Sequence, residues 1–209
     1  MRKIIVGVAL LTTTTTGIAF AAPSINGPTG LINTSSADVV AKGDVSIGYY
    51  NLDNGAVGNV NIGLAKNWEI GGSFLDPDAG SRINRLNVKY RITPETVVTP
   101  GLAIGLEDAG DKADRTGYIV ASKALPFGFR LHYGLGNGRY DGPFGGIEKT
   151  FNPLSALTGN STFPSTTLMA EYDGNDLNVG ARMSLVSGVK IDAGWKDMKD
   201  FYVGFSITK

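Results

Sequence analysis

The amino-acid sequence predicts an all-β protein, and more specifically a transmembrane, antiparallel, up-and-down β-barrel of about 12 strands. Three observations lead to this fold class. The chain begins with an export signal, about twelve of its segments alternate apolar and polar residues, and aromatic residues recur on the apolar side of those segments. Alternation with a period of two residues is the mark of a β-strand whose two faces meet different surroundings.

The first 21 residues have the three parts of a secretory signal peptide. Arg2 and Lys3 form a short positive region, residues 4–11 form an apolar run, and small residues at Ala19 and Ala21 predict cleavage after Ala21. An N-terminal membrane anchor is the alternative, but the apolar run is shorter than the roughly 20 residues that a spanning helix needs. We therefore expect export to a bacterial outer membrane.

The composition excludes several classes of protein. The chain has no cysteine, so neither disulfides nor a thiolate metal site can stabilise it. Its 19 basic residues, less the two of the signal peptide, leave 17 against 19 acidic residues, which disfavours a nucleic-acid partner. The 29 glycines are not periodic, which excludes collagen. We expect no cofactor, because the stretch GLGNG lacks a following helix and the stretch DPDAG lacks the closing glutamate of a calcium loop.

After a lead-in segment at residues 22–43, the predicted barrel domain occupies residues 44–209. Turn-rich stretches such as DNG and DPDAG separate the alternating segments. The spacing is about 14 residues per strand and turn, which suits membrane strands of about 9–11 residues. The predicted strands are centred on residues 44–52, 59–65, 68–74, 85–92, 101–106, 117–124, 127–135, 146–151, 167–172, 177–185, 189–195 and 201–207.

Two other architectures could hold twelve such strands, a soluble sandwich and a soluble lipocalin-like barrel. The residues on the two faces favour the membrane barrel, in which the apolar face meets lipid and the polar face lines a lumen. The predicted lipid face carries the aromatic residues Tyr49, Trp68, Phe74, Tyr90, Tyr118, Phe129, Tyr133, Tyr172, Trp195 and Phe201. The predicted lumen face carries the charged or titratable residues Arg85, Lys89, Arg91, Lys123, Arg130, His132, Glu171, Arg182, Lys190 and Asp192.

The ends and the longest loop of the predicted barrel follow from the same pattern. The strand at 201–207 reaches almost to Lys209, and pairing with the first strand would close the barrel and leave no edge. Residues 152–164 contain two prolines and no alternation, so we expect the longest connection there.

Two phrases of the sequence resemble the YjbH-like family, whose members are linked to exopolysaccharide production. The first phrase reads TGLINTSSA at residues 29–37, and the second lies within residues 145–148 and 171–180. Ser35 stands where the family usually has proline. The resemblance implies an outer-membrane β-barrel and a role in envelope polysaccharide. The matching residues are Thr29, Gly30, Leu31, Ile32, Thr34, Ala37, Gly43, Gly48, Tyr49, Gly145, Gly146, Glu148, Glu171, Tyr172, Asp173, Asn178 and Gly180.

Candidate enzymatic and metal sites are weak, so we expect no enzyme. A twelve-stranded barrel lipase needs a histidine on the lipid-facing wall, whereas the alternation around His132 places it in the lumen. The acidic residues Glu107, Asp108, Asp111 and Asp114 could bind divalent ions, but such a run is more often a solvated loop.

Two functional classes remain open. One is a barrel that assists envelope or exopolysaccharide secretion or assembly, or forms a narrow pore. The other is a structural or adhesive barrel with no transported substrate. The predicted excess of lumen cations suits an anionic solute or an inserted acidic segment. The expected partners are outer-membrane lipid and envelope polysaccharide or other export components.

Overall fold

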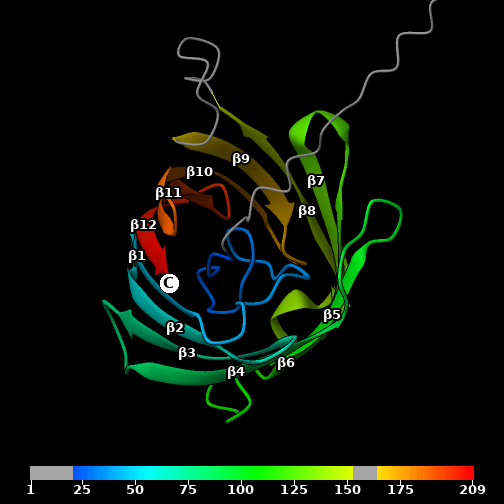
Figure 1. Ribbon diagram of the computed structural model, residues 1–209. Coiled ribbons are helices and arrows are strands. Elements are labelled where there is room, and N and C mark those ends of the chain that lie inside the picture. The colour runs from blue at the N-terminus through cyan, green and yellow to red at the C-terminus, as the bar shows by residue number, and fades with distance from the viewer. Residues whose placement is uncertain (1–20, 153–163) are drawn as a thin grey trace, which may run out of the picture.

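The computed structural model describes residues 21–152 and 164–209, which form a closed barrel of twelve antiparallel strands (Figure 1). The predicted fold and number of strands are confirmed. Two short 3-10 turns interrupt the connections, η1 (Pro126–Gly128) and η2 (Gly138–Tyr140). The strands are β1 (Val45–Leu52), β2 (Gly55–Ala65), β3 (Trp68–Pro77), β4 (Ile83–Thr93), β5 (Gly101–Glu107), β6 (Thr116–Ala124), β7 (Phe129–Gly136), β8 (Gly142–Phe151), β9 (Ser165–Tyr172), β10 (Leu177–Val186), β11 (Val189–Lys196) and β12 (Asp200–Thr208).

The last strand closes the barrel against the first, as the sequence predicts. Tyr49 of β1 lies opposite Phe205 of β12, and their rings are 6.1 Å apart on the outer face. The pairing runs to the end of both strands, where Val45 and Lys209 exchange backbone hydrogen bonds. Closure pairs the backbone groups of every strand and leaves no sheet edge.

The outer face of the barrel is apolar. On β4, Leu86 is 51% exposed, whereas Lys89 is 1% exposed and faces the interior, so the predicted face assignment of this strand is confirmed. Nine of the ten predicted aromatic residues lie on the outer face. The exception is Tyr118, which is 6% exposed and points inward, so that prediction was wrong.

Tyr118 packs inside the barrel because the middle of β6 is apolar on both faces. Tyr118 and Val120 point inward, while Ile119 on the same strand is 44% exposed. Inside, Tyr118 meets Tyr140 and Phe144 edge to face, and these two rings stack 3.8 Å apart. This aromatic cluster fills the part of the lumen beside β6 and η2.

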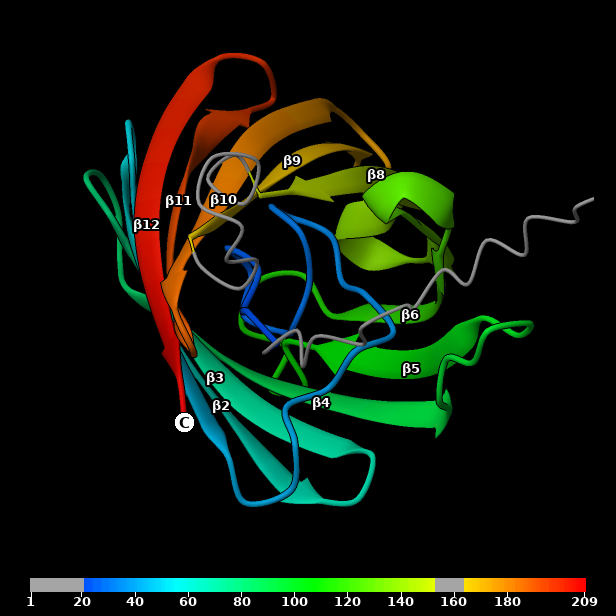
Figure 2. The same cartoon turned by 45° about the horizontal axis from the view of Figure 1, so that its top comes forward.

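Residues 22–43, predicted as a lead-in segment before the barrel, lie inside it. Figures 1 and 2 show this stretch, coloured blue, as a folded loop between the walls. Backbone bridges fold the segment onto itself at Pro23–Thr29 and Gly30–Ser35. Ile25, Leu31 and Ile32 pack with Tyr50 and Tyr202 of the wall. We call residues 22–43 the plug.

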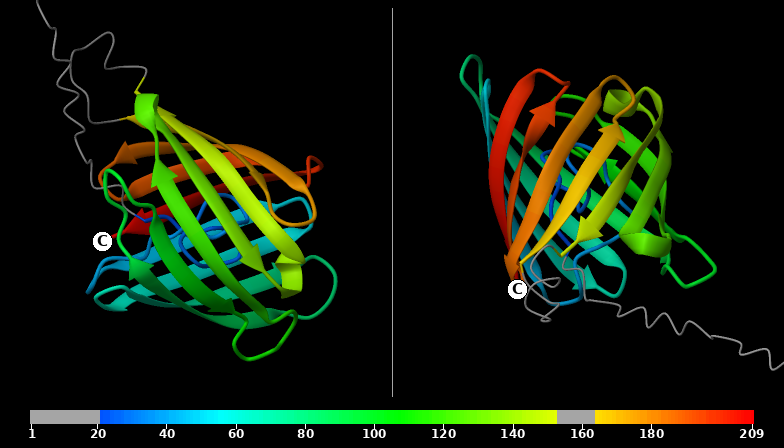
Figure 3. Two further views of the ribbon diagram at one scale, coloured as in Figure 1. Left: turned by 90° about the vertical axis from the view of Figure 1, so that its right-hand side faces the viewer. Right: turned by 90° about the horizontal axis from the view of Figure 1, so that it is seen from above.

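The barrel has two different ends, which are visible in the side views of Figure 3. We call the end that holds the β1–β2, β3–β4, β5–β6, β7–β8, β9–β10 and β11–β12 connections the distal mouth. The opposite end, which holds Asp44 and Lys209, is the proximal mouth. No helix in the described parts of the chain is long and apolar enough to cross a membrane. The predicted signal peptide lies almost wholly outside the described residues, as does most of the predicted loop 152–164.

Candidate functional site

Two buried glutamates hold the plug inside the barrel. Glu69 of β3 is 2% exposed and accepts hydrogen bonds from the backbone nitrogen of Thr29 at 2.9 Å, the hydroxyl of Thr29 at 2.6 Å and the backbone nitrogen of Val40 at 2.9 Å. It therefore ties together two parts of the plug that are eleven residues apart in the chain. The ammonium group of Lys89 lies 4.0 Å from the Glu69 carboxylate and compensates its charge.

Glu171 of β9 is 3% exposed and binds the turn of the plug at residues 32–34. Its Oε2 accepts from the backbone nitrogens of Ile32 and Thr34 at 3.1 and 3.3 Å and from the Thr34 hydroxyl at 2.7 Å. Its Oε1 accepts from the backbone nitrogen of Asn33 at 2.6 Å and from the side-chain amide of Asn178 at 2.9 Å. Successive backbone N–H groups of a tight turn thus form a nest around a carboxylate.

Cations of the wall bind the carbonyl groups of the same turn. Arg182 of β10 donates to the carbonyls of Gly30 and Leu31 at 3.0 and 2.9 Å, and it pairs with Asp192 of β11, which lies directly opposite. Lys89 donates to the carbonyl of Thr29 at 2.6 Å. The wall therefore satisfies both the donors and the acceptors of a plug that has little secondary structure of its own.

A charged cluster closes the proximal side of the plug. The guanidinium of Arg130 bonds the carboxylates of Asp38 in the plug and Glu95 in the β4–β5 turn, and it lies 3.8 Å from Glu148. Burial alone would raise the pKa of Asp38, but the charge and hydrogen bonds of Arg130 outweigh it and hold that pKa well below its usual range. Asp38 is therefore ionised at neutral pH.

His132 lies between Ser122 and Glu148, an order that has the residue types of a hydrolytic triad. Its Nδ1 is 2.8 Å from the Ser122 hydroxyl, and its Nε2 is 3.4 Å from Glu148. The Ser122 oxygen already accepts a hydrogen bond from the backbone nitrogen of Ala37 in the plug, and Ser122 is 1% exposed. A substrate carbonyl cannot reach this hydroxyl, so the cluster anchors the plug.

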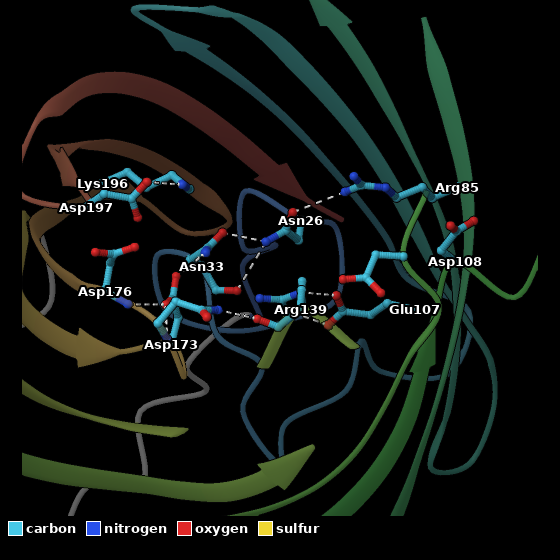
Figure 4. Close-up of a pocket in the computed structure, with 12 residues that line it drawn as sticks. Asn26, Asn33, Arg85, Glu107, Asp108, Arg139, Asp173, Asp176, Lys196 and Asp197 are labelled. Atoms are coloured by element: carbon cyan, nitrogen blue, oxygen red, sulfur yellow. Dashed lines mark hydrogen bonds and ion pairs between the residues drawn. The ribbon is translucent and has the colours of Figure 1, made fainter. Parts of the chain in front are cut away.

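At the distal mouth, the plug forms the floor of a polar cavity of about 390 Å³ (Figure 4). Arg139 of η2 is fixed there by a bidentate pair with Glu107 at 2.6 and 2.9 Å. Burial alone would raise the pKa of Asp173, but hydrogen bonds from the Asp176 backbone and from Asn33 and Asn178 hold it below its usual range. The cavity is lined by Asn26, Asn33, Arg85, Glu107, Asp108, Asp114, Arg139, Asp173, Asn175, Asp176, Lys196 and Asp197.

Comparison with known proteins places the chain in a family. The family model described as exopolysaccharide biosynthesis protein YbjH matches residues 24–178, a stretch that includes nearly all of the plug and β1 to β9. The chain belongs to the YjbH family. The plug, and not only the wall, is thus part of what defines this family match.

A solved structure shares the fold of this YjbH barrel. The chain titled "KdgM porin in complex with disordered oligogalacturonate" superimposes with a TM-score of 0.54 at 11% identity, over 79% of this chain and 97% of that one. At this identity the likeness shows the barrel fold alone. No curated protein matches the chain.

The two YjbH phrases of the sequence meet in space. The plug turn of the first phrase is bound by Glu171, and the Asn33 side chain is bound by Asp173, so both anchoring carboxylates come from the second phrase. Gly146 lies so close to the plug that an added Cβ would be 2.7 Å from the side chain of Leu31. Residues of the two YjbH phrases therefore form contacts that hold the plug against the wall.

Nine of the ten residues predicted to line the lumen do face the interior. Seven of them, discussed above, contact the plug, its anchors or the charged clusters around it. Arg91 follows the same alternation but binds the side chain of Asn67 in the β2–β3 turn, and Lys190 lies opposite the buried Ser206. Lys123 was placed wrongly, because it lies opposite the outward Leu131 and donates to the carbonyls of Thr96 and Val97 at the rim.

The interior also holds acids that the sequence analysis missed. Glu69, Glu107 and Glu148 lie on the inner face, which removes much of the predicted excess of cations. The alternation of the strands could have revealed these acids, because Glu69 and Glu148 fall on the same side of their strands as the other inward-facing residues. Among the described residues, no group of three or more histidine, cysteine or acidic side chains is placed to hold a metal ion. In the acidic run, Glu107 and Asp111 pair with arginines, and Asp108 caps the turn that follows it.

Proposed function

We propose that this YjbH-family protein is an outer-membrane β-barrel that assists the secretion or assembly of an envelope polysaccharide without acting as an open pore. The observation that carries the proposal is the combination of an apolar outer face with a filled polar interior. Exposed residues such as Leu64, Phe74 and Phe205 cover the outer wall, where a lipid environment would bury them. A soluble protein rarely exposes so continuous an apolar surface.

The contacts of the plug support a closed lumen. Hydrogen bonds to charged groups contribute about 1.5–3 kcal/mol each, so the four plug donors on Glu171 amount to roughly 6 kcal/mol or more. Glu69, Arg182 and Arg130 add further anchors from other strands. Thermal motion alone would therefore leave the plug in place, and a passing solute would have to meet the barrel at its mouths.

The family assignment supports the link with exopolysaccharide, since that word is in the description of the matching family. A structural or adhesive barrel is the second candidate, and the filled lumen favours it equally. We infer no enzymatic activity, because Ser122 and His132 are both engaged and buried beneath the plug.

Membrane fractionation and gene deletion test the two parts of this proposal separately. We expect the protein in the outer-membrane fraction, with a mobility in gel electrophoresis that changes on heating. Recovery as a soluble periplasmic monomer without detergent would refute the membrane placement. We expect deletion of the gene to lower the amount of surface polysaccharide, whereas an unchanged amount would favour the structural barrel.

A further inference from the structure

The cavity at the distal mouth is large enough to admit a small ligand. Its volume of about 390 Å³ lies in the range of small-molecule pockets, which begins near 300 Å³. Its lining comes from the plug, β4, β5, β11, η2 and the β5–β6, β9–β10 and β11–β12 connections, so eight parts of the fold converge on one space (Figure 4).

The floor and walls of this cavity are held in place by their own hydrogen bonds. Asn33 in the plug is held by Asp173, and Asp173 also accepts from the backbone nitrogens of Asn175 and Asp176 at 3.2 and 3.0 Å. The guanidinium of Arg139 lies over the Tyr140 ring at 4.0 Å and bonds its hydroxyl. A ligand would meet donors and acceptors that are already oriented.

The charge of the lining is strongly negative. Six carboxylates and three cations line the cavity, and two of the cations are used, since Arg139 pairs with Glu107 and Lys196 pairs with Asp197. Arg85 is left with four aspartates. These four aspartates are Asp108, Asp114, Asp173 and Asp176, so the lining has an excess of three negative charges.

Two further features point to a ligand. Asp108 is 0% exposed, and its Oδ1 finds no hydrogen-bond partner within the described parts of the chain. Asp114 in the β5–β6 connection and Asp176 in the β9–β10 connection are both exposed, and within the described parts of the chain neither carboxylate accepts a hydrogen bond. Unused acceptors thus surround a space that is open to solvent.

A cleft lined by one sign of charge concentrates ligands of the opposite sign and repels those of its own. A polyuronate would meet a lining with three more carboxylates than cations, so the anionic solute that the sequence suggested does not suit this mouth. A ligand with hydroxyl groups and an ammonium group could use the exposed carboxylates of Asp114 and Asp176.

We propose that the distal cavity is a binding site for an amine-bearing saccharide, whose ammonium group faces Asp114 and Asp176. This inference rests on the proposed role in envelope polysaccharide, and it names the class of sugar that such a role would involve. The site requires no movement of the plug, because the plug is its floor.

Calorimetric titration of the full chain in detergent micelles tests the proposal with three probes. These are hexamers of glucosamine, of N-acetylglucosamine and of galacturonic acid, compared at about pH 6. We expect the glucosamine hexamer to bind about tenfold more tightly than its acetylated counterpart at low salt, and this difference to shrink at high salt. We expect no binding of the galacturonate hexamer.

A matched pair of variants locates the binding. Asp114→Asn with Asp176→Asn should weaken glucosamine binding about tenfold, whereas Asp78→Asn with Asp141→Asn, which removes the same charge outside the cavity, should have little effect. Equal effects of the two pairs, tighter galacturonate binding, or no binding of the glucosamine hexamer would each overturn this inference. Galacturonate binding would leave the proposed polysaccharide role standing, and that role fails only if deletion leaves surface polysaccharide unchanged.

Discussion

Replacing Glu171 by glutamine should loosen the plug, because this one side chain accepts five hydrogen bonds in the interior of the barrel. Glutamine keeps the shape of the side chain but turns one oxygen into an NH₂ donor. If the amide nitrogen takes the place of Oε1, the backbone nitrogen of Asn33 and the side-chain amide of Asn178 face a donor instead of an acceptor. A buried group left without a partner costs about 1–3 kcal/mol, so with two such groups the variant should lose roughly 2–6 kcal/mol.

This loss is large compared with the total stability of a typical domain, about 5–15 kcal/mol. Reversible unfolding by urea in phospholipid vesicles measures it directly, and single-channel recording on the same protein reports whether the lumen opens. We expect Glu171→Gln to unfold at lower urea and to show conductance that the wild-type protein lacks. Asp76→Asn is the control, since the carboxylate of this exposed residue near the end of β3 pairs only with the exposed Arg82 within the described structure.

The reasoning would be refuted by a Glu171→Gln protein that unfolds within about 0.5 kcal/mol of wild type and remains closed. In that case the carboxylate would not anchor the plug, and the backbone donors around it would not contribute to the free energy of unfolding. A loss of stability with no conductance would show that the plug stays in the lumen by its other anchors.

Three further predictions concern the outer wall, the plug and its acid sensitivity. Val88→Arg should lower the free energy of unfolding in lipid by about 2–4 kcal/mol if the site lies near the bilayer midplane. Asp78→Arg, in an exposed turn, should not. Equal small losses for both variants in vesicle unfolding would mean that no lipid covers β4. Gly30→Ala should cost about 1–3 kcal/mol by overpacking, because the added carbon would lie 2.0 Å from the Thr34 carbonyl, while Gly58→Ala enters open space and should unfold like wild type in the same assay. The pKa of Asp173 is lower in the folded protein than its ordinary value of about 4, so its contribution to stability is complete above that value and is lost as the pH falls through the folded value. The urea midpoints at pH 6 and pH 3 should therefore differ less in Asp173→Asn than in the wild-type protein. An equal difference in the two proteins would contradict this prediction.

Lys89 shows what the structure adds even where the face of a residue was predicted correctly. The alternation of β4 places it in the lumen, and a lumen lysine exposed to water could be replaced by glutamine at little cost. The structure buries it against the Thr29 carbonyl and near the Glu69 carboxylate. Removing one partner of such a buried pair leaves an uncompensated charge and is costly.

The sequence by itself determined the strands, the closure of the barrel and the faces of most strands. Alternation with period two needs only local information, because a side chain on a strand can point to one of two sides. Where both sides are apolar this information fails, and β6 is the example: Tyr118 was assigned outward and Lys123 inward, and both assignments were wrong. The choice there depends on the ring cluster with Tyr140 and Phe144, which comes from residues beyond the strand.

Only the tertiary structure decided what fills the barrel. Nothing in the local pattern of residues 22–43 says that they fold inward, since a segment without regular structure owes its conformation to partners elsewhere. Those partners are Glu69, Arg182 and Glu171, and Glu171 is 137 residues from the Thr34 that it binds. The cavity at the distal mouth has the same origin, because its charge comes from turns that closure of the barrel brings together around the plug. Contacts between residues so far apart in the chain arise from closure and packing of the barrel, and the residue pattern of a single strand does not predict them.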